Sequence, residues 1–173
     1  MGILDSVNDV LKKYSSGGAE NTANAPEHFD QVAKAAPTGV IAEGLAAAFR
    51  SDQTPNFGTL VGDLFSRSNG EQKAGILNHL LASAGPGVLS QIGSSGPLTE
   101  LLGSAGRGIT ADQAQGISPE AVQQLATHAE KVDPSVVDKA SAFYAQHSTL
   151  VKTLGGAALS IALAKVAERQ RAA

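Results

Sequence analysis

Three successive helix starts lie between residues 117 and 166, and they constrain the fold more than any other feature of the chain. Ser118-Pro119 places a hydroxyl at an N-cap and a proline at the first helical position, where its missing N–H leaves no bond unmade. Asp133-Pro134 repeats the pattern with a carboxylate, which also suits the positive end of the helix dipole. His147-Ser148 offers a third cap. The stretch therefore predicts three helices in succession.

The apolar residues between these caps recur with the period of an α-helix. They are Val122, Leu125, Ala126 and Ala129, followed by Val136, Val137, Ala140, Phe143 and Tyr144. The chain contains 19 glycines, which break it often, and few segments combine β-branched alternation with hairpin turns. We therefore expect an all-α protein, a compact bundle of several short helices.

The N-terminal residues 2–14 form one amphipathic stripe at helical spacing. Its apolar members are the candidate interface residues Ile3, Leu4, Val7, Val10, Leu11 and Tyr14. The next stretch, SSGGAENTANAP (15–26), has the composition of a flexible linker. We therefore expect the helix over residues 1–14 to move independently of the body of the protein.

The rest of the chain divides by composition into a glycine-punctuated helical region (27–105), a linker (106–116) and a C-terminal helical region (117–173). Whether residues 27–105 and 117–173 share one core stays open at this stage. In the first region, Thr38 is expected to cap a helix, and Ser68 with Glu71 fits a capping box. The clearest stripe there consists of Phe57, Leu60, Val61, Leu64 and Phe65, and shorter pieces are expected near 88–92 and 98–102.

The segments ISPEAVQQLA (117–126) and VDPSVVDKASAFYAQHSTLVKTLGG (132–156), with the start MGILDSVNDVL, resemble the YidB-like family of bacterial helical proteins. The resemblance lies mainly in residues 1–11 and 117–156. It implies a bacterial origin, an all-helical fold and a homeodomain-like arrangement of the C-terminal part. The family has no assigned biochemical activity, so the resemblance implies no catalytic or binding residue.

The sequence shows no pattern typical of a catalytic, cofactor-binding or metal-binding site. The absence of cysteine excludes disulfides, Cys-ligated zinc, iron–sulfur clusters and thiol catalysis. The four histidines, His28, His79, His128 and His147, are far apart in the chain and form no zinc-binding pair. The glycines between 103 and 108 lack the ending of a phosphate loop, and no nucleophile elbow follows a strand. We therefore expect a protein that is not an enzyme, with no cofactor and no metal.

Charge and hydropathy narrow the partners and the location. A formal net charge of −3 argues against nucleic acid, because phosphate binding needs a surplus of Lys and Arg on one face. The most apolar run, Leu154 to Val166, is shorter than the roughly 20 residues that span a bilayer. Asp5 and Asp9 stand where a secretory signal would be positive. Together with the lack of cysteine, this pattern indicates a cytoplasmic protein.

The expected partner is a second copy of the chain. An apolar stripe on a tethered helix must be covered by its own body or by a neighbour, and exchange of such a helix between copies gives a homo-oligomer or larger assembly. The alternative is a peripheral membrane or lipid-binding protein, in which Lys12 and Lys13 of the same helix meet anionic headgroups. A third interpretation, an apolar ligand pocket among residues 38–102, identifies no small-molecule substrate. The sequence leaves open whether the helix docks in cis or in trans.

Overall fold

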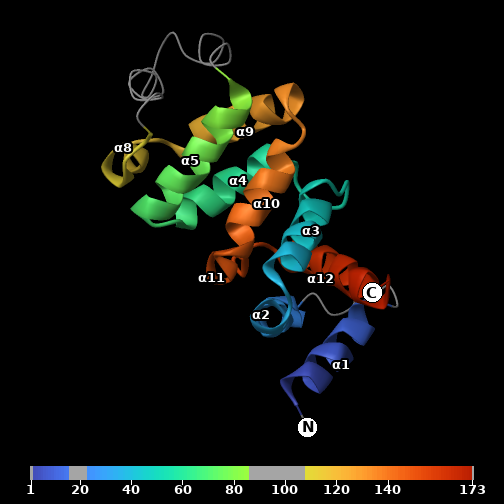
Figure 1. Cartoon of the computed structure of the whole chain (residues 1–173). Coiled ribbons are helices and arrows are strands. Elements are labelled where there is room, and N and C mark those ends of the chain that lie inside the picture. Colours follow the sequence, from blue (N-terminus) through green and yellow to red (C-terminus); the bar gives the residue numbers. More distant parts are fainter. Residues whose placement is uncertain (1, 16–22, 86–107, 173) are drawn as a thin grey trace. The chain divides into compact units, whose positions relative to one another are not determined.

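The protein was analysed as a computed structural model, which describes residues 2–15, 23–85 and 108–172. Within these ranges the chain is helical and contains no β-strand, so the all-α prediction is confirmed (Figure 1). The helices are α1 (Ile3–Ser15), α2 (Ala25–Ala35), α3 (Thr38–Phe49), α4 (Phe57–Arg67), α5 (Gly70–Ala84), α8 (Ala111–Gln115), α9 (Pro119–Val132), α10 (Val136–Ala145), α11 (Ser148–Val151) and α12 (Gly156–Ala172).

The chain forms two units. We call residues 1–56 and 141–173 the terminal unit, because it holds both ends of the chain, and residues 57–140 the central unit. Helix α10 runs from the central unit into the terminal unit. The units cut across the division expected from composition, because the regions 27–105 and 117–173 both contribute to each unit. In the terminal unit α3 packs on α12, and in the central unit α4 packs on α9.

The terminal unit is built on a close contact between α3 and α12, which Figure 1 shows side by side. Gly44 of α3 makes this contact close, because a Cβ added there would lie 2.7 Å from the carbonyl oxygen of Ala162 and 2.9 Å from a methyl carbon of Val166. Glu43 forms an ion pair with Arg169 beside it. The small residues thus let two helices bury apolar surface at native packing density, as their abundance in the sequence indicates.

The central unit is organised around the contact of α4 with α9. The five residues of the α4 stripe are all buried, as their spacing predicts: Phe57, Leu60, Val61, Leu64 and Phe65. Gly58 lies against α9 so closely that an added Cβ would collide with the side chain of Thr127. Gln123 of α9 donates a hydrogen bond to the Thr59 hydroxyl at 2.8 Å. A polar contact therefore fixes the register of the two apolar faces.

The expected cap at Ser118 and a further cap at Thr110 are present in the central unit. The Ser118 hydroxyl accepts a hydrogen bond from the Ala121 N–H at the start of α9. Thr110 and Gln113 form a reciprocal capping box that starts α8. Helix α8 lies inside the stretch 106–116, for which a linker was expected, and the buried Ile109 also belongs to the unit. The N–H of Ile109 donates to Oδ1 of Asn78 at 2.9 Å.

Two other predictions named the wrong capping residues. The capping box of α5 joins Asn69 to Gln72 rather than Ser68 to Glu71. The Ser68 hydroxyl instead donates to the Leu64 carbonyl at 2.7 Å, at the end of α4. Thr38 is the first residue of α3, whose N-cap is Pro37 and receives no side-chain hydrogen bond. A helix that follows a proline turn therefore starts here without the hydroxyl cap.

The C-terminal helix starts follow the sequence in part. Asp133 accepts hydrogen bonds from the N–H and the hydroxyl of Ser135, and α10 begins three residues after Asp133. His147 is the N-cap of α11 but makes no side-chain cap bond, and α11 has only 4 residues. Residues 152–155 separate α11 from α12, so the helix is broken before Gly156. The expected buried helix therefore begins at Gly156.

Helices occupy both ends of the stretch 15–26, for which a linker was expected. Ser15 is the last residue of α1, and Ala25 is already the first residue of α2. Residues 16–22 lie outside the described ranges, as do the short pieces expected near 88–92 and 98–102. Seven residues, SGGAENT, thus join the two described segments.

Candidate functional site

Helix α1 has the charge pattern of a stable amphipathic helix. Asp5 lies in its first turn and accepts a hydrogen bond from the Gly2 N–H at 3.2 Å. Lys12 and Lys13 lie in its last turn, where cations interact favourably with the helix dipole. Lys12 also lies 3.7 Å from the carboxylate of Asp9. These charged side chains are exposed, and the opposite face carries the apolar stripe.

The apolar stripe of α1 is covered by the terminal unit of the same chain. The exposed fractions of Val7, Val10, Leu11 and Tyr14 are 3%, 6%, 4% and 2%. Helix α1 packs against α12 and α2, so the candidate interface docks in cis. The side chains of Ile3 and Leu4 lie outside the described set. At about 25 cal/mol per Å² of apolar surface removed from water, such burial is the main force that holds the helix in place.

A side-chain contact joins the last turn of α1 to α2. The hydroxyl of Tyr14 lies 2.7 Å from Nδ1 of His28, and the two rings meet edge to face with centroids 5.6 Å apart. With a neutral imidazole protonated on Nε2, the tyrosine hydroxyl donates to Nδ1. Burial raises the pKa of Tyr14, so the hydroxyl keeps its proton. A polar bond therefore sets the orientation of α1 at the end of its apolar stripe.

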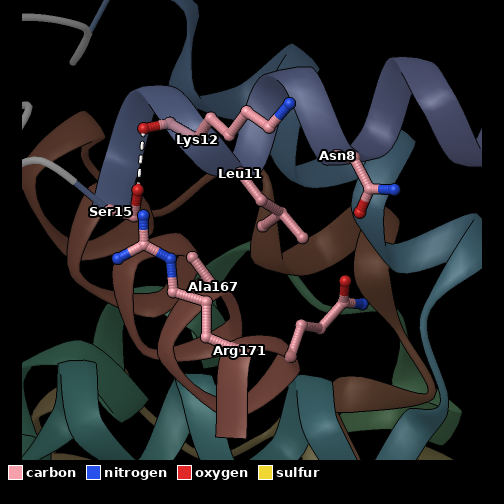
Figure 2. A pocket seen from close by; sticks show the side chains of 7 residues that line it. Asn8, Leu11, Lys12, Ser15, Ala167 and Arg171 are labelled. Atoms are coloured by element: carbon pink, nitrogen blue, oxygen red, sulfur yellow. Dashed lines mark hydrogen bonds between the residues drawn. The ribbon is translucent and has the colours of Figure 1, made fainter. Parts of the chain in front are cut away.

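Helix α12 provides the other wall of the docking site. Figure 2 shows Leu11 of α1 and Ala167 and Arg171 of α12 reaching toward the seam between the two helices. The Ser15 hydroxyl donates to the Lys12 carbonyl at 2.9 Å and closes the last turn of α1. A shallow hollow of ≈ 260 Å³ runs along this seam. Its lining residues are Asn8, Leu11, Lys12, Ser15, Ala167, Gln170 and Arg171.

A second hollow of ≈ 460 Å³ is lined by Tyr14 and Ser15 at the end of α1. Its lining is apolar in part, with Ala47, Ile161 and Ala164, and charged at Lys165, Glu168 and Arg171. Lys165 and Glu168 pair with each other at 3.2 Å, so their charges balance. Both hollows are open to solvent and are lined by residues of α1 and α12. They border the site where α1 docks.

Helix α2, which also packs against α1, forms ion pairs through Asp30. Asp30 accepts a hydrogen bond from Lys34 at 2.7 Å and lies 3.6 Å from Lys152, which follows α11. The hydrogen bond from Lys34, with a smaller contribution from Lys152, lowers the pKa of the Asp30 carboxyl. The pairs tie α2 to the segment after α11 and so help to place His28 under α1.

Two of the four histidines contact aromatic side chains. His28 contacts Tyr14, and the ring of His147 lies 4.7 Å from that of Phe143, whereas His79 and His128 belong to the central unit. In the part of the chain that the structure describes, no three His, Asp or Glu side chains are placed to hold a metal ion. The polar hollow on α9, which includes His128 and Lys131, is wide and shallow. The α1 docking site is therefore the most developed candidate.

The sequence identified one side of this site and missed the other. The stripe on α1 follows from its period, but His28 was considered only as an isolated histidine. A usable signal exists, because His28 neighbours Phe29 on the face of α2 formed by the buried Ala25, Phe29 and Val32. The partner helix α12 carries no local signal for α1, because periodicity marks which face is buried but not what buries it.

The longest described helix, α12, has 17 residues. Across residues 2–15, 23–85 and 108–172, no helix combines the length and apolarity needed to cross a membrane. Comparisons of the chain with protein-family models, with curated proteins and with solved structures gave no match.

Proposed function

We propose that this chain is a non-enzymatic helical protein that acts by protein–protein contact, and that it assembles with copies of itself by exchanging α1. The observation that carries the proposal is the docking of an amphipathic helix, through Val7, Val10, Leu11 and Tyr14, onto α2 and α12 of its own chain. The same acceptor surface exists on every copy. A second copy could therefore receive α1 with the same contacts.

The connection to α1 supports exchange. Only the nine residues 16–24 separate the end of α1 from the start of α2, and an extended chain of that length reaches about 30 Å. Because the contacts are the same in cis and in trans, protein concentration and the strain of the connection decide between the two states. The apolar stripe stays covered in both states, so neither state exposes an apolar surface to solvent.

Light scattering coupled to size-exclusion chromatography tests the proposal over a range of protein concentrations. We expect the complete chain to form oligomers as its concentration rises, and a chain without residues 1–16 to lose this concentration dependence. A chain that stays monomeric at the highest concentration reached would contradict self-assembly. A Lys12→Ala, Lys13→Ala variant is the matched control, because both lysines lie on the exposed face of α1.

A cross-linking experiment identifies the exchanged helix directly, since the chain contains no cysteine. Asn8→Cys in one copy and Gln170→Cys in another place thiols on α1 and α12, at the same hollow. When the two variants are mixed, a short bismaleimide should give a covalent dimer that contains one copy of each. Cross-linked pairs of identical copies, or none, would contradict exchange of α1.

The second candidate function is association with a membrane surface or lipid through the same helix. Lys12 and Lys13 are exposed at the end of α1, where anionic headgroups could meet them. The buried stripe disfavours this function while α1 is docked, so membrane binding requires α1 to be released first. Co-sedimentation with anionic vesicles tests it, and equal binding by the chain without residues 1–16 would contradict it. A bacterial, cytoplasmic protein of the YidB-like kind remains our proposal for origin and location.

A further inference from the structure

The contact between Tyr14 and His28 lies where α1 ends and the connection to α2 begins. Tyr14 is 2% exposed, and its hydroxyl is 2.7 Å from Nδ1 of the half-buried His28. A neutral imidazole accepts this hydrogen bond at Nδ1. A protonated imidazole carries hydrogen on both nitrogens, so Nδ1 can only donate and the tyrosine must turn its own proton away. Protonation of His28 therefore disturbs the bond that orients α1.

The charges nearest to His28 strengthen this effect. Lys13, next to Tyr14 on α1, repels a cation at His28, whereas Glu27 on α2 attracts one. Burial is the largest influence and lowers the pKa of His28 below its ordinary value, Lys13 lowers it further, and Glu27 opposes both. The docked helix thus favours a neutral histidine.

The other elements packed on α2 provide little compensation for a cation there. Asp30 already binds Lys34 and Lys152, and α11 itself carries no charged residue. On α12, Glu168 pairs with Lys165 and Arg169 pairs with Glu43, while Arg171 adds a further positive charge at the hollow beside Tyr14. The acidic side chains of these elements are therefore engaged with their own basic partners.

We infer that Tyr14 and His28 form a pH-sensitive latch, in which protonation of His28 releases α1 from α2 and α12. The latch connects the last turn of α1 to α2. Release exposes the apolar stripe of α1. Binding of that stripe by a second copy rests on the proposed function, whereas the release of α1 does not rest on it.

The direction of the pH dependence follows from the two states of His28. In released chains His28 titrates near its ordinary value of 6.5, and in docked chains its pKa is lower. The contribution of the neutral histidine to docking is therefore complete above about pH 6.5 and is lost as the pH falls below that value toward the lower pKa of the docked state. The hydroxyl of Tyr14 does not titrate in this window, because burial raises its pKa.

Hydrogen exchange of the α1 amides in the complete chain tests the latch at a dilute, monomeric concentration. Protection factors, taken against the intrinsic exchange rate at each pH, separate opening of the helix from the chemistry of exchange. We expect protection of residues 7–15 to be constant above about pH 6.5 and to fall as the pH is lowered below that value, while the protection of α4 and α9 stays constant. His28→Asn keeps an acceptor but cannot titrate, so it should remove the pH dependence. His79→Asn, on the exposed surface of α5, should leave it unchanged.

Each outcome decides between the inferences. Constant protection of α1 across the pH range, or a response that survives in both His28→Asn and His28→Gln, overturns the latch. Light scattering on the same samples at high concentration distinguishes the latch from the proposed function. A pH-dependent loss of protection in a chain that never oligomerises supports the latch and overturns self-assembly, whereas oligomers with pH-independent protection do the reverse.

Discussion

Tyr14 and Tyr144 show how one residue type has opposite consequences in two surroundings. The Tyr14 hydroxyl bonds to His28, whereas the hydroxyl of Tyr144 is fully buried and has no hydrogen-bond partner among the described residues. The ring of Tyr144 packs at 6.1 Å from Phe49 and 5.4 Å from Phe143. Aromatic packing thus holds a polar atom in an apolar place, and burial raises its pKa.

Removal of each hydroxyl should therefore change stability in opposite directions. We expect Tyr144→Phe to raise the free energy of unfolding by about 1 kcal/mol, because it removes an unsatisfied buried polar group. Tyr14→Phe should lower it by about 1 kcal/mol, because it removes the hydrogen bond to His28. Urea denaturation followed by circular dichroism measures both. A loss of stability in Tyr144→Phe would show that its hydroxyl has a partner in solution.

Gly44 and Gly39 give a second comparison, within α3. A Cβ at Gly44 would lie 2.7 Å from the Ala162 carbonyl, whereas a Cβ at Gly39 would meet nothing within 4 Å. We expect Gly44→Ala to destabilise the protein by about 1–3 kcal/mol through overpacking. Gly39→Ala should stabilise it by ~0.5–1 kcal/mol, because alanine loses less backbone freedom in a helix. Equal effects in urea denaturation would mean that α3 and α12 can move apart without loss.

At the scale of elements, the sequence predicted the buried face of a helix better than the residue where the helix starts or the helix that packs against it. The stripes of α1 and α4 follow from spacing, because a helix that buries one face must repeat its apolar residues every three or four positions. The start of α5 was placed one residue early, because Ser68 and Asn69 both have capping side chains and only the end of α4 decides between them. The cap of α9 at Ser118 had no such competitor and was predicted correctly.

In the proposed assembly, the connection before α2 determines which copy receives α1. Deletion of Gly17, Gly18 and Ala19 leaves four of the seven residues between Ser15 and Ala23. We expect this shorter connection to raise the dimer fraction measured by light scattering, because a strained hinge favours exchange over docking in cis. Insertion of three Gly-Ser pairs at the same place is the control and should lower it. An unchanged dimer fraction in both variants would show that assembly does not depend on the length of this connection.

At the scale of the whole molecule, the division into units was beyond the sequence. Composition marks places where a chain is locally polar or rich in glycine, but a unit is defined by contacts, and Glu43 pairs with Arg169 across 126 positions. The pairing of α3 with α12 depends on Gly44 fitting against Ala162, a match of shapes that neither segment shows alone. The all-α class needed no such information and was predicted correctly.

Removal of α12 should therefore affect the two units differently. A chain that ends at Gly155 lacks the helix on which α1, α2 and α3 pack, whereas α4, α5, α8 and α9 keep their contacts with one another. We expect hydrogen exchange to show loss of protection in residues 2–15 and 23–56, with protection retained in 57–85 and 108–140. Loss in both units would show that they unfold as one cooperative body.

The order of the helices along the chain has a consequence for biosynthesis. Helices α1, α2 and α3 are translated first, but α12, which covers them, is translated after the whole central unit. Domains generally fold as they emerge from the ribosome, so the central unit can close while the earlier helices still lack their partner. During that interval the apolar faces of α1 and α3 are open to chaperones and to neighbouring nascent chains on the same messenger RNA. The proposed assembly between copies could therefore begin before any one copy is complete.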